Sequence, residues 1–290
     1  MKIRYFQKGF NYSQDGRGNR LVYHLQGCNM KCPWCANPEG MLAEGVLMTN
    51  AEWLADSCCP KGAVKNRQLD RSFCAGCTDR PCVNSMRQKG ICLSCREDDV
   101  ENILADCISC IPMYFDGGGV TLTGGEVCMQ YAAVKQLLEK LGEQGIHRTI
   151  ETNGSLPHSI DLIPLVDEWI MDFKHWNNEK HSQWLGVGNA GVLSTLKLVT
   201  QQHADVLIRI PMMPGFNDSE ADAKAFAECL APFAARANVR MEVLTYHEFG
   251  KSKWSQCGWE YPMKGGRISA VSKKQLEDAL KASGIRLVRT

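Results

Sequence analysis

The feature that most constrains the fold is a repeated alternation of short strand-like and longer helical patterns. The strand-like stretches are residues 20–27, 119–123, 147–151, 169–173, 205–210 and 239–244. Between them lie helical patterns such as the apolar face formed by Val134, Leu137, Leu138 and Leu141. Six or seven such units in one chain predict an α/β fold, in which a parallel sheet curls into a full or partial barrel.

One segment interrupts this alternation. Residues 41–96 show no sustained helical or strand period, and an apolar helix face returns from Val100 to Ile108. The chain is therefore expected to divide into a barrel, residues 1–40 and 97–290, and an insertion, residues 41–96. At the far end, Ser272 with Gln275 three residues on predicts a capping box at the start of the last helix, and Gly284 predicts its end.

Unusual residues follow the predicted strands. In parallel α/β sheets, chemistry takes place at the C-terminal ends of the strands. Six successive strand ends carry Cys28, Cys32 and Cys35; Gly124, Gly125 and Glu126; Glu151, Thr152 and Asn153; Asp172 and Lys174; the stretch 209–215; and Tyr246 and His247. Their convergence predicts an enzyme with its active site at one mouth of the barrel.

The first of these strand ends reads GCNMKCPWC, residues 27–35, with the cysteine spacing C-x3-C-x2-C. A structural zinc site or a ferredoxin cluster would normally use four cysteines. Three cysteines imply an open coordination position on the metal or a further ligand elsewhere in the chain. Seven more cysteines fall between Cys58 and Cys95, so the chain is expected to bind metal more than once.

The composition argues against several classes of partner. The 290 residues include 33 basic and 32 acidic side chains, which gives no reason to expect nucleic acid. No apolar run reaches the roughly 18 residues of a membrane span, and the N-terminus lacks the apolar stretch of a signal peptide. A cytoplasmic location is expected, where the 15 cysteines should remain free of disulfides.

Taken in order, these motifs resemble those of the radical S-adenosylmethionine (SAM) enzymes. Within that superfamily they resemble the activating enzymes of glycyl radical enzymes, such as pyruvate formate-lyase activating enzyme. The matching stretches are CNMKCPWC (28–35), GGGVTLTGGE (117–126), ETNG (151–154), MDFK (171–174), the stretch 209–218 and YHEFGKSK (246–253). The resemblance implies a partial (β/α)6 TIM-like radical SAM barrel with an inserted, cysteine-rich, ferredoxin-like segment.

The resemblance also implies a reaction. Cys28, Cys32 and Cys35 would hold three irons of a catalytic 4Fe-4S cluster, and the fourth iron would bind the amino and carboxylate groups of SAM. Reductive cleavage of SAM would release methionine and a 5′-deoxyadenosyl radical, which removes hydrogen from a backbone glycine of a partner glycyl radical enzyme. A flavodoxin- or ferredoxin-type protein would donate the electron.

Individual roles at SAM follow from the same resemblance. The residues expected there are Trp34, Gly124, Gly125, Glu126, Thr152, Asn153, Asp172, Lys174, Arg209 and His247. Trp34 would pack near the adenine, Glu126 would lie near the ammonium group, and the two glycines would let the backbone approach the methionine moiety. Asp172 and Lys174 would offer opposite charges to the methionine zwitterion, and His247 would contact the adenosyl portion.

A monovalent cation site is a further implication, at Glu151, Thr152, Met171 and Asp172. Here Glu151 replaces a more usual aspartate.

Several of these residues have structural alternatives. In isolation, Trp34 could belong to the core, Lys174 could be a solvated charge, and His247 could be a hydrogen-bonded structural histidine. Lys251 and Lys253 could bind a partner or belong to a solvated loop. The cysteines interpreted as small core residues are Cys107, Cys110, Cys128, Cys229 and Cys257.

The insertion resembles part of a ferredoxin-like segment with two C-x2-C-x2-C-x3-C-P motifs, in which the last cysteine of each motif ligates the other motif's cluster. Cys59-Pro60 resembles the end of the first motif, and a later triplet resembles the second. One auxiliary 4Fe-4S cluster is therefore expected, held by Cys59, Cys74, Cys77 and Cys82. Cys92 and Cys95 could replace a member, complete a second cluster or bind zinc.

Three functions compete at this point. An activating enzyme is favoured, because GGGVTLTGGE and YHEFGKSK together are more specific than the cysteine motif alone. A radical SAM enzyme acting on a small molecule or nucleotide is the main alternative. A non-catalytic iron or zinc protein would not explain why unusual residues follow all six strands.

Overall fold

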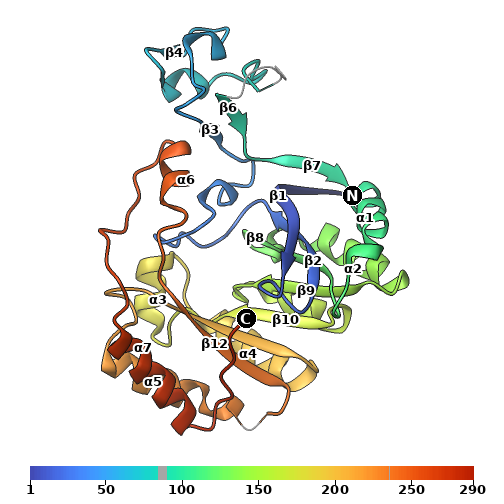
Figure 1. Cartoon of the computed structure of the whole chain (residues 1–290), viewed down its shortest axis with the longest axis vertical. Coiled ribbons are helices and arrows are strands. Elements are labelled where there is room, and N and C mark those ends of the chain that lie inside the picture. The colour runs from blue at the N-terminus through green and yellow to red at the C-terminus, as the bar shows by residue number, and fades with distance from the viewer. Residues whose placement is uncertain (84–89, 235) are drawn as a thin grey trace.

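The computed structural model describes residues 1–83, 90–234 and 236–290. Its centre is an eight-stranded sheet of order β12-β11-β10-β9-β8-β2-β1-β7 (Figure 1). The strands are β1 (Lys2–Tyr12), β2 (Asn19–Leu25), β7 (Arg96–Asp99), β8 (Gly119–Gly124), β9 (His147–Thr152), β10 (Glu168–Asp172), β11 (Val206–Met212) and β12 (Val239–Thr245). The run from β2 to β12 is parallel, whereas β1 is antiparallel to β2 and to β7. This is the predicted partial barrel.

The six parallel strands are those expected from the sequence, whereas β1 and β7 were not predicted. β7 reads REDD, and the second half of β1 is mostly exposed. The first half of β1 does alternate, with Ile3 and Tyr5 buried between exposed Lys2 and Arg4, whereas β7 has no apolar residue. Pairing at the edge of the sheet, which is a tertiary effect, is what makes a strand of β7.

Helices cover the outer face of the sheet. They are α1 (Val100–Ser109), α2 (Tyr131–Glu143), α3 (Asn178–Leu185), α4 (Ala190–Gln202), α5 (Glu220–Ala234) and α7 (Ala270–Ala282). A further helix, α6 (Lys251–Gln256), lies beside residues 38–40 and the insertion instead. Short 3-10 turns are η1 (Pro38–Gly40), η2 (Asp56–Cys58), η3 (Arg71–Cys74), η4 (Ile111–Met113), η5 (Val127–Gln130) and η6 (Pro157–Leu165). Among the described residues, no helix has both the length and the apolar character needed to cross a membrane.

The start of the last helix corrects one expectation. Ser269, not Ser272, is the N-cap of α7, because the Ser269 side chain accepts a hydrogen bond from the Ser272 backbone N–H. The predicted end is confirmed, since Gly284 follows the helix with a φ of +80°. Two serines three residues apart offer two possible caps, and the sequence alone does not choose between them.

Alternation along the strands separates an apolar outer face from a polar barrel interior. On β8, Val120 and Leu122 pack into the main hydrophobic core, whereas Thr121 and Thr123 bond to the polar side chains Arg20 and Glu151. The same period of two runs through the other parallel strands. The interior side chains on this polar face include Arg20, Thr149, Glu168, Arg209, Arg240 and Glu242.

The described residues of the insertion form a small unit beside the barrel, near α6 in Figure 1. β3 (Leu47–Thr49) pairs with β6 (Ile91–Leu93), and β4 (Val64–Lys65) pairs with β5 (Gln68–Leu69). These pairs have a core of their own, made by Leu54, Cys58, Val64, Cys82 and Ile91. The expectation that five other cysteines are core residues holds in the structure: Cys107, Cys128 and Cys257 are buried, and Cys110 and Cys229 pack against the core.

Candidate active site

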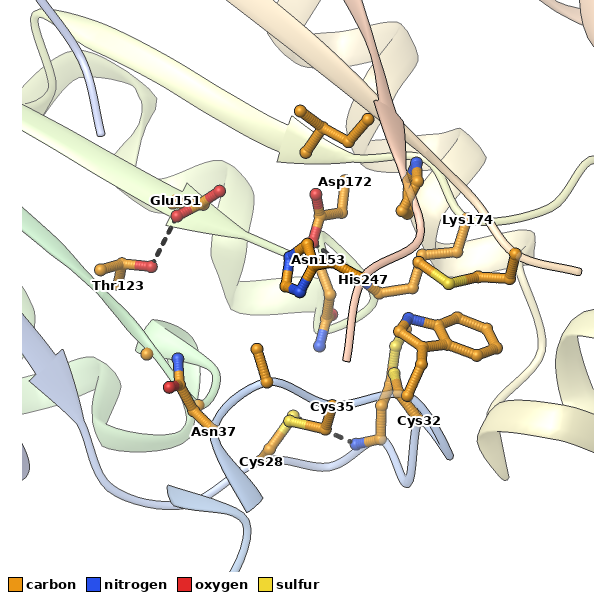
Figure 2. Close-up of a pocket in the computed structure, with 18 of the residues that line it drawn as sticks. Cys28, Cys32, Cys35, Asn37, Thr123, Glu151, Asn153, Asp172, Lys174 and His247 are labelled. Atoms are coloured by element: carbon orange, nitrogen blue, oxygen red, sulfur yellow. Dashed lines mark hydrogen bonds and ion pairs between the residues drawn. The ribbon is translucent and has the colours of Figure 1, made fainter. Parts of the chain in front are cut away.

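The three cysteines of the first strand end lie together on one loop. Cys28, Cys32 and Cys35 line a cavity of about 280 Å³ at the C-terminal ends of the parallel strands (Figure 2). The loop is closed at its base, because the Gly27 N–H donates to the Gly40 carbonyl at 2.7 Å and the Cys28 N–H donates to the Met41 carbonyl at 3.0 Å. The cysteine side chains are therefore presented to the cavity from an anchored turn.

Gly125 lets the second strand end approach this loop. A Cβ at Gly125 would lie 2.1 Å from the Gly27 carbonyl oxygen, which also accepts a hydrogen bond from the Glu126 N–H at 2.8 Å. Gly124 has a φ of +107°, which disfavours any residue with a Cβ. Both glycines line the cavity. Here glycine permits close backbone approach between the two loops, in addition to its expected role near the methionine moiety.

The opposite wall of the cavity carries a close ion pair. Lys174 Nζ lies 2.5 Å from Asp172 Oδ2, and both side chains line the cavity. Burial by itself lowers the pKa of Lys174. Asp172 and the neighbouring Cys32 raise this pKa by more than burial lowers it, so the net shift is upward. Lys174 therefore stays charged at any physiological pH. The alternative of a solvated strand-end charge is excluded, since only 11% of the Lys174 side chain is exposed.

Trp34 and His247 form two other parts of the boundary. Trp34 is buried and packs against Phe216 with ring centroids 4.9 Å apart, yet it also lines the cavity. It is therefore both a core residue and a cavity wall. His247 is exposed at the rim, where its ring stacks on Phe249 at 4.3 Å. The Phe249 N–H donates to His247 Nδ1 at 3.4 Å, so His247 is hydrogen-bonded, as the structural alternative expected, and it also lines the cavity. Asn153, directly after β9, completes the predicted residues at the cavity.

Glu126 and Thr152 take other positions. The Glu126 carboxylate is fully buried and accepts hydrogen bonds from Cys128 N, Thr152 Oγ1 and Asn153 N, at 3.1, 2.7 and 2.8 Å. These bonds tie the end of β8 to the end of β9 behind the cavity lining. Neither side chain is among those that line the cavity, and the expected places of Glu126 near the ammonium group and of Thr152 at SAM stay predictions. Both hold the site together from behind.

Arg209 is also bound by protein groups. Its guanidinium is buried in the barrel interior, with Nη1 2.5 Å from Glu151 Oε1 and Nε 3.3 Å from Glu242 Oε2. Its Nη2 donates to the carbonyl of Gln14. Of these partners, Glu151 lines the cavity. Arg209 therefore joins β9, β11 and β12, and its expected role at SAM stays a prediction.

The same contacts bear on the expected cation site. Of its four residues, Glu151 and Asp172 line the cavity. Both carboxylates already have cationic partners, since Glu151 pairs with Arg209 and Asp172 pairs with Lys174. Adjacent residues on a strand point to opposite faces, and Met171 lies in the hydrophobic core. The cation site stays a prediction.

Several residues that line the cavity were not expected from the sequence, and the alternation of side chains along a strand accounts for two of them. Thr123 lines the cavity and donates to Glu151 Oε2 at 2.7 Å. It sits two residues from Gly125 on a strand whose alternate residues face inward, and that spacing could have identified it. Asn37, Pro211 and Met213 also line the cavity. Pro211 lies on β11 two residues after Arg209, so the same spacing could have identified it. Asn37 and Met213 lie outside the strands, where sequence gives no rule for side-chain direction.

The donor set fits an iron-sulfur cluster with a zwitterionic ligand. Burial raises the pKa of the Cys28 thiol to about 12 and also raises the pKa values of Cys32 and Cys35. The thiols are therefore protonated without metal, and iron binding must release their protons. In the described residues, no three metal-ligating side chains converge on one ion. A cluster does not require that, because each cysteine binds a different iron.

Four thiols of the insertion lie close enough to influence one another. After burial, the largest cause that raises the pKa of Cys82 is Cys59, followed by Cys74 and Cys77. Burial and then Cys59 likewise raise the pKa of Cys74. The remaining two cysteines have other surroundings. Burial raises the pKa of Cys92 and Arg96 lowers it, while for Cys95 the charged neighbours include Arg4 and Glu97.

Comparison with known proteins gives a consistent result. The family model described as "Radical SAM superfamily" matches residues 22–227 of this chain. A choline trimethylamine-lyase activating enzyme from Oleidesulfovibrio alaskensis is 33% identical, covering 91% of this chain and 89% of its own. A (2S)-3-sulfopropanediol sulfolyase activating enzyme from Bilophila wadsworthia is 33% identical, and the match covers 92% of this chain and 93% of that enzyme. A radical SAM methyltransferase from Sphaerobacter thermophilus shares the fold, with a TM-score of 0.56 at 16% identity over 96% of this chain and 67% of its own.

Proposed function

The chain belongs to the radical SAM superfamily, and from that premise we propose that it is the activating enzyme of a glycyl radical enzyme. The relatives that match along nearly the whole of both chains are named as activating enzymes. The observation that carries the proposal is the placement of three thiols from one loop around the same cavity as the Asp172–Lys174 pair and two glycines. These are the parts that a cluster-bound SAM requires.

The residues divide the work as follows. Cys28, Cys32 and Cys35 would hold the 4Fe-4S cluster at the mouth of the barrel. When bound, this cluster supplies the electron that cleaves SAM into methionine and a 5′-deoxyadenosyl radical. Lys174 would attract the methionine carboxylate and Asp172 its ammonium group, which would orient the sulfonium before its bond to the adenosyl carbon is cleaved. The two side chains pair with each other at 2.5 Å, so this ion pair would have to open to receive the zwitterion.

The apolar part of the lining has a separate task. Trp34, Pro211 and Met213 face the cavity, and Trp34 is backed by Phe216 and Trp184. Such a wall excludes water and side chains that could quench a reactive intermediate. His247, exposed at the rim, lies where the adenosyl portion and the incoming partner loop would meet.

We also propose that the insertion, residues 41–96, holds one auxiliary 4Fe-4S cluster through Cys59, Cys74, Cys77 and Cys82. The closeness of Cys59, Cys74 and Cys77 to Cys82, whose pKa all three raise, supports this set over one that includes Cys92 or Cys95. An auxiliary cluster here would relay electrons from a flavodoxin- or ferredoxin-type donor. The 15 thiols, all free in the structure, favour a reducing, cytoplasmic compartment for such chemistry.

The decisive experiment measures two products, 5′-deoxyadenosine and a glycine-centred radical. The protein is reconstituted with iron and sulfide under anaerobic conditions, reduced, and supplied with SAM. Formation of 5′-deoxyadenosine would establish radical SAM chemistry. A glycine-centred radical, detected by electron paramagnetic resonance (EPR) on an added glycyl radical enzyme, would establish activation. Choline trimethylamine-lyase and (2S)-3-sulfopropanediol sulfolyase are the first partners to test. Cleavage of SAM with no radical on any partner would favour the alternative, a small-molecule or nucleotide substrate.

A further inference from the structure

Helix α6 presses against the cysteine loop through a lysine that the proposed reaction does not use. Lys253 Nζ donates to Asn37 Oδ1 at 2.8 Å and pairs with Glu39 Oε1 at 2.6 Å. Asn37 follows Cys35 by two residues, and Glu39 lies in η1, the turn that closes the loop. Lys253 therefore points inward, although its sequence position also suited a solvated loop or a partner contact.

The ion pair is nearly enclosed. Only 7% of the Glu39 side chain is exposed, and its second oxygen, Oε2, is buried with no hydrogen-bond partner among the described residues. A buried carboxylate is costly unless a counter-charge accompanies it. Within the part of the chain that the structure describes, Lys253 is the only cation in an ion pair with Glu39. The position of η1 therefore depends on Lys253.

Two neighbours of Lys253 reach the last cysteine of the loop. Trp254 Nε1 donates to the Cys35 carbonyl at 2.9 Å. At Gly250, which precedes α6, an added Cβ would lie 2.6 Å from Ala36 Cα and 2.8 Å from the Cys35 carbonyl oxygen. Backbone, indole and ammonium groups of one short segment thus contact residues 35–39 in succession.

The other end of α6 is fixed to the insertion. The Gln256 carbonyl accepts hydrogen bonds from Arg71 Nη2 at 3.0 Å and from Thr49 Oγ1 at 3.4 Å. Arg71 begins η3, the turn that ends at Cys74. The helix is therefore held at both ends, which makes it a rigid support for the loop rather than a mobile flap.

From these contacts we propose that Lys253 is a positioning residue of the cluster-binding loop, which acts through Glu39 and Asn37 to fix the place of Cys35. The inference rests on the proposed function, because it assigns Lys253 a part in holding the proposed cluster site. It predicts that loss of the ammonium group displaces η1 and with it the third cysteine. The cluster would then meet SAM in an altered geometry.

The test compares Lys253→Met with Lys253→Arg and with Lys251→Met. Lys251 is the matched control, because it lies on the same helix and its side chain is 56% exposed. Its ion pair is with nearby Glu248, and its Nζ lies 5.9 Å from the centroid of the Tyr261 ring. In the protein without iron, hydrogen–deuterium exchange should speed up in peptides spanning residues 28–41 for Lys253→Met. Lys253→Arg and Lys251→Met should exchange like the wild type. This readout does not depend on activity.

In the reconstituted enzyme, Lys253→Met should alter the EPR signal of the reduced cluster on SAM addition and raise the KM for SAM at least about tenfold. The arginine variant should stay within about threefold of the wild type. A Lys253→Met protein that loses thermal stability but keeps wild-type exchange, EPR response and KM would overturn the proposal. Gly250→Ala, which displaces the same loop without removing a charge, should reproduce the altered exchange and EPR response even if Lys253→Met does not fold. A wild-type response from folded Gly250→Ala would also count against the proposal. Failure of the wild type to cleave SAM would instead refute the proposed function.

Discussion

Arg209 on β11 forms an ion pair with Glu151 on β9 inside the barrel, with Nη1 2.5 Å from Oε1. The same guanidinium meets Glu242 on β12. Burial alone lowers the pKa of Arg209, but the two carboxylates outweigh it and raise the pKa. One cation thus lies between two carboxylates, of which Glu242 is buried and Glu151 is partly exposed, and offsets part of their negative charge.

Replacing Arg209 should therefore affect stability before it affects SAM binding. Arg209→Met is expected to lower the free energy of unfolding by about 3–5 kcal/mol, because it removes the counter-charge of the buried Glu242 carboxylate. Urea denaturation of the iron-free protein measures this loss. Adding Glu151→Gln and Glu242→Gln should recover part of it. An Arg209→Met protein of unchanged stability but much weaker SAM binding would instead support the role at SAM that the sequence predicts for Arg209.

The catalytic cysteines should behave differently from the structural ones. Cys32→Ala should abolish 5′-deoxyadenosine formation while leaving the fold intact, because Cys32 is only partly buried where it packs against the edge of the core. Cys229→Ala is the control, since Cys229 lies on α5 and packs at the edge of that core. Product analysis after anaerobic reconstitution, with circular dichroism of each variant, gives the comparison. Near wild-type cleavage by Cys32→Ala would contradict the central assignment.

The number of clusters can be counted. With one catalytic and one auxiliary 4Fe-4S cluster, the protein should bind about eight irons, and a variant lacking Cys28, Cys32 and Cys35 should keep about four. Adding Cys77→Ala to that variant should remove most of the remainder, whereas adding Cys92→Ala should not. Anaerobic iron and sulfide analysis of each variant measures the number of clusters. About eight irons in the triple variant would indicate two auxiliary clusters, and zinc in place of iron would make the insertion a structural zinc site.

His175, next to Lys174, should make stability depend on pH. Its side chain is fully buried, its Nε2 lies 3.0 Å from the Phe216 carbonyl oxygen, and its Nδ1 accepts from the Asn177 N–H. Burial lowers the pKa of His175 from 6.5 to about 4. Between these values the unfolded chain binds a proton that the native protein does not, so stability rises with pH in this window.

The contribution of His175 is thus complete above about pH 6.5 and is lost as the pH falls to about 4, a loss of up to about 3 kcal/mol. Urea midpoints of the iron-free wild type and of His175→Gln, measured from pH 7 to pH 4, test this. The glutamine variant should show a shallower pH dependence. His247→Gln, which alters an exposed histidine, should keep the wild-type slope. Equal slopes for the wild type and His175→Gln would refute the prediction.

The sequence by itself determined the barrel, the six parallel strands, the cysteine loop and the strand ends that form the cavity. These features depend on short-range patterns. Apolar residues with a period of two or 3.6 define strands and helices, and the C-terminal ends of parallel strands meet at one edge whatever the details of packing. Cys28, Asp172, Lys174 and His247 could therefore be placed at a common site.

Only the tertiary structure decided which neighbouring polar residues face the cavity and which support it. Glu126 and Arg209 stand in matching motifs, yet their side chains are bound by protein groups from other strands. Lys253, which the sequence left between a partner contact and a solvated loop, turned inward because Glu39, 214 residues away along the chain, is buried and needs a counter-charge. Such pairings are absent from local sequence, because desolvation and charge compensation arise only when distant segments pack together.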